Sequence, residues 1–120
     1  MREAVHAYNR TFRSALSPRE AEAAVLLKAA MQLQSVRDDW DNQAPALREA
    51  LDFNRKLWTI LSVSVAAPDS PLPQHVRQGM TDLSVFVFRR ILDTMIEPAA
   101  EKLGALISIN RNLAAGLRGE

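Results

Sequence analysis

The sequence predicts an all-α protein, a small antiparallel helical bundle of four main helices with a short N-terminal helix. Apolar residues recur at steps of three and four along most of the chain, which places them on one side of a helix. No segment alternates convincingly between apolar and polar residues, so we expect no strands. The 120 residues include only four glycines, and abundant alanine and leucine favour helix over sheet. This length suits one domain over residues 1–120.

An apolar stripe and a helix-start signal predict the first two helices. We expect a short amphipathic helix over residues 2–14, because Val5, Tyr8, Phe12 and Leu16 recur at helical spacing. The next helix begins around Ser17 and Pro18, because the Ser17 hydroxyl can accept a hydrogen bond from the Glu20 amide and proline fits a first helical turn. We expect this helix to fade over residues 38–41, which are polar apart from Trp40, with Trp40 covering an edge of the core.

Prolines divide the second half of the chain. Pro45 suits the start of the next helix, which runs to about residue 65. Residues 66–73 contain three prolines and cannot be the interior of a helix, so we expect a stiff loop with Leu72 tucked into the core. A further helix follows from about Gln74 to Ile96, and the last main helix closes the chain after Pro98. In an up-down-up-down order, the second and fourth main helices are parallel and diagonal.

Those two helices each carry an Asn-Arg pair inside an apolar stripe. The first pair, Asn54-Arg55, lies in ALDFNRKLWTIL with Trp58, and the second, Asn110-Arg111, lies in LISINRNLAAGL. A buried amide without a partner costs about 1–3 kcal/mol, so each Asn needs a hydrogen bond. The favoured interpretation is an internal polar pair that keeps the bundle in one arrangement. The alternative is that both pairs face a groove for another protein.

The helix over residues 74–96 is apolar on more than one side. One stripe contains Val76, Met80, Leu83, Val87 and Ile91, and a second contains Val85, Phe88, Leu92 and Met95. Such a helix is either central in its bundle, which is slightly favoured in so small a domain, or covered by a partner. If a partner covers it, the second stripe is the candidate binding surface, with Arg89 or Arg90 at its rim.

Composition and motifs argue against several classes of function. A net charge of +1 calls for neither nucleic acid nor an anionic membrane. With no cysteine and two histidines, thiol catalysis and the usual metal sites are not expected. There is no phosphate-binding loop, nucleophile elbow or apolar span long enough for a bilayer. We therefore expect no enzyme, no cofactor, no bound metal and no membrane insertion, and a cytoplasmic location.

Several segments together resemble the flagellar biosynthesis regulator FlaF of alphaproteobacteria. The shared segments are Ala7-Tyr8, Ser17–Glu22, ALxxNRKLWTIL from Ala50, Leu72-Pro73 and LISINRNLAAGLRG from Leu106. The two Asn-Arg segments are the most specific of these, and the likeness covers nearly the whole chain. Asp69-Ser70-Pro71 departs from the family, in which an acid-Asn pair is common before the Leu-Pro.

The resemblance implies a small cytoplasmic protein needed for flagellin production and export, which acts on flagellin as a chaperone or secretion adaptor alongside the regulator FlbT. Unassembled flagellin exposes apolar helical stripes, and a groove containing residues 85–95 can cover one of them by helix-in-groove packing. The alternative is a post-transcriptional regulator that acts on flagellin messenger RNA directly or through FlbT, although direct nucleic-acid binding is not favoured. A scaffold among export components is a third option. The sequence leaves the oligomeric state open.

Overall fold

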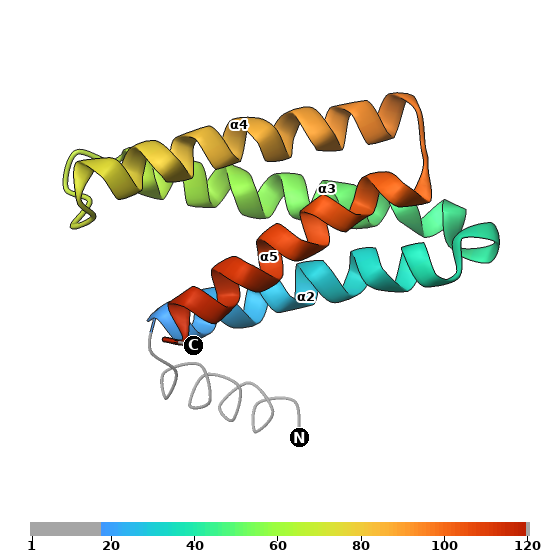
Figure 1. Ribbon diagram of the computed structural model, residues 1–120, viewed down its shortest axis with the longest axis horizontal. Helices are drawn as coiled ribbons and strands as arrows, with labels where there is room; N and C mark the ends of the chain where they lie inside the picture. The colour runs from blue at the N-terminus through green and yellow to red at the C-terminus, as the bar shows by residue number, and fades with distance from the viewer. Residues whose placement is uncertain (1–17, 120) are drawn as a thin grey trace, which may run out of the picture.

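The computed structural model describes residues 18–119, and the short helix expected over residues 2–14 lies outside this range. The described part of the chain confirms the all-α class, with no strand between residues 18 and 119. Figure 1 shows the four main helices that it contains. In chain order they are α2 (Pro18–Asp38), α3 (Trp40–Ala66), α4 (Gln74–Ile96) and α5 (Leu103–Leu117), with the short 3₁₀ helix η1 (Ala100–Lys102) before α5.

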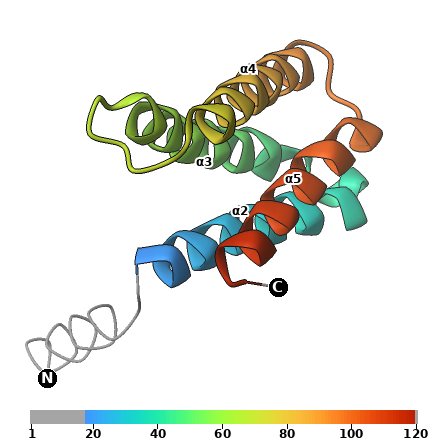
Figure 2. The ribbon, with the colours of Figure 1, turned by 60° about the vertical axis from the view of Figure 1, so that its left-hand side comes forward.

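The four helices pack as two antiparallel pairs. The closest contacts are between α2 and α5, then between α2 and α3 and between α3 and α4, whereas α4 and α5 barely approach each other. Figure 2 shows the α2–α5 pair and the α3–α4 pair as separate layers joined along α2 and α3. Helices α3 and α5 run in the same direction on a diagonal of the bundle (Figure 1). This arrangement confirms the predicted relation between the two helices that carry the Asn-Arg pairs.

The connection between α2 and α3 differs from the sequence-based expectation. Only Asp39 leaves the helical conformation, with φ −133° and ψ 49°, and α3 begins at Trp40 rather than near Pro45. The Asp39 carbonyl accepts from the backbone amides of Asn42 and Gln43, which starts the new helix at once. Pro45 then lies one turn inside α3, where its ring leaves the Asp41 carbonyl without a helical partner. Because Asp41 is exposed, water can reach that carbonyl.

The turn between α3 and α4 is held by Arg77. Its Nε donates to the Val65 carbonyl at 3.1 Å, and its Nη2 lies 3.5 and 3.4 Å from the carbonyl oxygens of Ala66 and Ala67. These are carbonyls at the end of α3, which lack partners within the helix. The expected loop is present, but Leu72 is exposed, so its predicted burial was wrong. The α3–α4 turn projects beyond the α2–α5 pair (Figure 1), so no helix between residues 18 and 119 covers Leu72 there.

Replacing Arg77 by methionine should lower the free energy of unfolding by about 1–2 kcal/mol, because hydrogen bonds from a charged donor to the end of α3 are lost. Methionine keeps most of the length of the side chain, so packing changes little. Urea unfolding measures the difference. Arg89→Met is the matched control, because Arg89 is exposed on the same helix and should change stability by less than about 0.5 kcal/mol. Equal effects of the two variants would contradict the capping role of Arg77.

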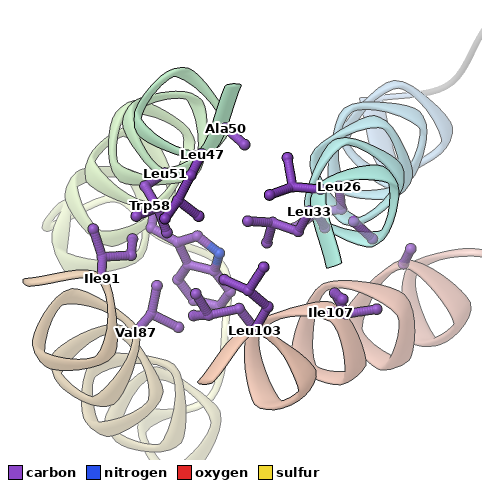
Figure 3. Close-up of a cluster of buried hydrophobic side chains, with 14 of the residues drawn as sticks. Leu26, Leu33, Leu47, Ala50, Leu51, Trp58, Val87, Ile91, Leu103 and Ile107 are labelled. Atoms are coloured by element: carbon purple, nitrogen blue, oxygen red, sulfur yellow. The ribbon is translucent and has the colours of Figure 1, made fainter. Parts of the chain in front are cut away.

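The core lies where the four helices meet and is centred on Trp58. The Trp58 side chain is fully buried, and Figure 3 shows its indole ring surrounded by labelled aliphatic residues from all four helices. Trp40 is half-buried and packs against this cluster, as expected for an edge residue. The labelled aliphatic residues larger than alanine are Leu26, Leu33, Leu47, Leu51, Val87, Ile91, Leu103 and Ile107.

Candidate protein-binding surface

A buried hydrogen-bond chain connects the two Asn-Arg helices. The Trp58 indole Nε1 donates to Asn110 Oδ1 at 2.9 Å, and Asn110 Nδ2 donates to Asn54 Oδ1 at 2.6 Å. Asn54 Nδ2 donates in turn to the Ala50 carbonyl at 2.9 Å, within its own helix. An indole N–H can only donate, so Trp58 fixes which end of the Asn110 amide faces it. The chain therefore closes without an unpaired heavy atom among the three side chains.

This geometry favours the interpretation of Asn54 and Asn110 as an internal polar pair over their placement in a groove for another protein. Asn54 and Asn110 are 0% and 1% exposed and bond to each other in the core, so neither amide faces a groove. The arginines that follow them are exposed. Arg55 lies 3.6 Å from Asp52 on the same helix, and Arg111 hydrogen-bonds to Gln34 of α2. Each motif therefore places one polar group inside the bundle and one outside.

Helix α4 buries an unusual face. Its four buried residues are Ser84, Val87, Ile91 and Thr94, so half of them carry a hydroxyl group. Ser84 Oγ donates to the Met80 carbonyl at 2.8 Å, and Thr94 Oγ1 donates to the Arg90 carbonyl at 2.6 Å. These internal bonds satisfy both hydroxyl groups without help from another helix. Neither predicted apolar stripe included Ser84 and Thr94, although their spacing of 3, 4 and 3 residues with Val87 and Ile91 is a helical stripe.

Several large apolar residues of α4 lie on its outer side instead. Val85, Leu92 and Ile96 are 43%, 58% and 76% exposed. Their spacing of seven and four residues places them along one side of the helix, with Arg89 between Val85 and Leu92. Single exposed apolar residues are ordinary on protein surfaces, but three along one side of the same helix, with only Arg89 between Val85 and Leu92, form a patch.

The candidate residues on α4 divide between this patch and its borders. Phe88 and Met95 are half-buried and pack against the core, next to the exposed residues. We call this set the α4 surface, and it consists of Val85, Phe88, Arg89, Leu92, Met95 and Ile96. Ile96 is the member that the candidate set from the sequence lacked.

Arg90 does not belong to the α4 surface. Its guanidinium lies 5.3 Å from the centre of the Phe86 ring, and its Nη1 lies 3.5 Å from the Lys102 carbonyl. Both contacts turn it toward the side of α4 that faces η1. Arg89 is therefore the α4 arginine beside the exposed apolar residues.

A shallow cleft extends the α4 surface toward α3. The cleft has a volume of about 260 Å³. Met95 and Pro98 line one side of it, and the residues of α3 that line the other side are Ala44, Leu47, Arg48 and Leu51. Arg55 follows Arg48 by seven residues and lies along the same side of α3. Helical spacing alone therefore puts Arg55 on the side of α3 to which Arg48 belongs, and its ion pair is with Asp52. Arg111, which pairs with α2, lies elsewhere.

Other kinds of site find little support among the described residues. Between residues 18 and 119, no three His, Cys, Asp or Glu side chains gather as a metal site would require. Within that same range, no helix combines the length and apolar character needed to cross a bilayer.

Comparison with protein families matches residues 4–117 to the family described as Flagellar protein FlaF. The chain belongs to the FlaF family. The matched range includes both Asn-Arg motifs and the whole α4 surface, so the hydrogen-bonded core and the exposed patch both lie in the family's domain. Comparisons with curated proteins and with solved structures gave no match. Family membership makes this a flagellar protein and confirms the resemblance that the Asn-Arg segments indicated.

Proposed function

We propose that this FlaF protein binds flagellin through the α4 surface, as a chaperone or secretion adaptor that supports flagellin synthesis and export. The proposal makes it a binding protein rather than an enzyme. Membership of a flagellar family supports the choice of partner. The distribution of residues on α4 supports the choice of surface, and it is the observation that carries the proposal.

Folding alone favours burial of large apolar side chains over burial of hydroxyl groups. Burying a leucine or isoleucine side chain contributes about 1.5–3 kcal/mol, yet α4 buries Ser84 and Thr94 while Leu92 and Ile96 stay exposed. A partner that covers the α4 surface recovers this contribution when it binds. Unassembled flagellin presents apolar helical stripes, and an amphipathic helix laid along α4 buries both stripes at once.

Arginines beside the α4 surface favour a partner helix that has acidic side chains next to its apolar stripe. Arg89 lies within the surface, and Arg48 lines the adjoining cleft. Arg55, which is paired with Asp52, lies seven residues further along α3. Acidic side chains next to the apolar stripe of the partner complement these arginines and fix its orientation. Exposed charge pairs contribute little to affinity, so apolar contact carries most of the binding.

Co-purification of the full-length protein with flagellin from the same organism, after nuclease treatment and at low and high salt, tests the proposal. We expect a one-to-one complex that survives high salt, because apolar packing is insensitive to ionic strength whereas phosphate contacts weaken steeply. No complex at either salt concentration would contradict the proposal. That result would favour the alternative, in which the protein acts on flagellin messenger RNA directly or through FlbT.

A further inference from the structure

We propose that two copies of this chain form a dimer through the outer face of α3, with the two α3 helices antiparallel. This outer α3 face consists of Lys56, Thr59, Ile60 and Val63. The four residues recur at the spacing of one side of a helix, and all of them are exposed. Ile60 and Val63 are 68% and 67% exposed. The outer α3 face shares no residue with the α4 surface.

The neighbouring helices cover only the opposite side of this part of α3. Trp58, Leu61 and Val65 are buried on that side. Toward the α3–α4 turn, α2 diverges from α3, as Figures 1 and 2 show. Folding of residues 18–119 of one chain therefore leaves two large apolar side chains of the outer α3 face in water, which is typical of an interaction surface.

The outer α3 face can be buried without leaving a polar group unpaired. The Thr59 hydroxyl already donates to the Arg55 carbonyl at 2.7 Å, within the same helix. Residues 57–68 contain no Asp, Glu, Lys, Arg or His. A partner that placed a charge against this stretch would lose the hydration of that charge without gaining a counter-ion. The same uncharged stretch of a second copy meets it at no such cost.

Opposite charges lie at the two ends of the uncharged stretch. Lys56 precedes it and Asp69 follows it, and both residues are exposed. Neither side chain has a hydrogen-bond or ion-pair partner among residues 18–119. A reversed second copy therefore offers each of these charges a partner of opposite sign, whereas a parallel copy places Lys56 beside Lys56.

The spacing along α3 fits this reversed arrangement. When the two-fold axis passes midway between Ile60 and Val63, each Ile60 meets the partner's Val63. Lys56 then lies about 8 Å from the axis along the helix, at a rise of about 1.5 Å per residue. The turn that contains Asp69 begins at Ala67, which lies about 8 Å from the axis on the other side. Lys56 of each copy thus reaches the level of the partner's Asp69.

Sedimentation velocity of the full-length protein over a dilution series, without flagellin, tests the proposal. We expect a dimer that dissociates on dilution, because a contact through one helix per copy is at the small end of protein interfaces. Ile60→Asp should raise the dimer dissociation constant at least about tenfold. Leu92→Asp is the matched control, because Leu92 is 58% exposed on α4, and it should leave the constant unchanged. A monomer at every concentration up to about 1 mM, or equal effects of the two variants, would overturn the proposal.

A charge exchange tests the antiparallel arrangement separately. Lys56→Glu should weaken the dimer about threefold or more at low salt, because it brings like charges together. Addition of Asp69→Lys to this variant should restore the dissociation constant to within about twofold of the parent value. A double variant that stays as weak as Lys56→Glu would contradict the arrangement. No sample contains flagellin, so these outcomes are independent of the function proposed for the α4 surface.

Discussion

Asn110→Leu should destabilise the protein by about 2–5 kcal/mol, because it removes the centre of the buried hydrogen-bond chain. Leucine has the same branching and the same number of side-chain heavy atoms as asparagine, so the loss is chiefly polar. The Trp58 indole N–H loses its acceptor and Asn54 Oδ1 loses its donor, and each unpaired buried group costs about 1–3 kcal/mol. Urea unfolding of the full-length protein measures the change.

Asn54→Leu is the matched comparison and should cost less, about 1–3 kcal/mol. It leaves only the Asn110 amide N–H without its partner, because the Ala50 carbonyl keeps its helical bond. The free energy of unfolding of the double variant should fall by less than the sum of the two single changes, because each single variant already removes the Asn54–Asn110 hydrogen bond. If Asn54→Leu proves the more damaging, the direction of the hydrogen-bond chain is wrong. Loss of flagellin binding without loss of stability would place the amides at an interface instead.

Leu92→Asp should weaken flagellin binding by roughly 10- to 100-fold. Burial of a leucine side chain contributes about 1.5–3 kcal/mol. Because each 1.4 kcal/mol changes the affinity about tenfold, loss of this contribution accounts for the expected range. The desolvation of an unpaired carboxylate at the interface adds to the loss of affinity. The melting temperature should stay within a few degrees of the parent value, because Leu92 is 58% exposed in the free protein. Titration calorimetry and thermal unfolding of the same preparation separate the two effects.

Met31→Asp is the control for this variant. Met31 is 67% exposed on α2, so it receives the same charge at a similar exposure but away from the α4 surface. We expect its affinity for flagellin to equal that of the parent. An equal loss of affinity in both variants, or in neither, would remove the α4 surface from the proposal. Phe88→Ala is less suitable because Phe88 packs against the core, and its stability would change together with its affinity.

Local sequence signals located most of the helices. The start of α4 at Gln74 and its end at Ile96 agree with the expected boundaries. Proline lacks the backbone N–H that a helix interior needs, so the proline-rich loop and Pro98 limit the helix whatever surrounds them. The start of α3 was misplaced by the same kind of reasoning. Pro45 was expected to begin the helix, but hydrogen bonds to the Asp39 carbonyl start it at Trp40, and a proline near a helix start is tolerated where its carbonyl partner is exposed.

By itself, the sequence predicted an all-α chain that resembles the FlaF family, with its two Asn-Arg helices on a diagonal if the helices run up-down-up-down. It required both Asn side chains to be satisfied, because an unpaired buried amide is costly wherever it lies. Only the tertiary structure decided that Asn54 and Asn110 bond to each other, with Trp58 as the donor at the end of the chain. It also decided which side of α4 faces outward. An apolar stripe shows that a helix has something to bury, and only the positions of the neighbouring helices determine which stripe is covered.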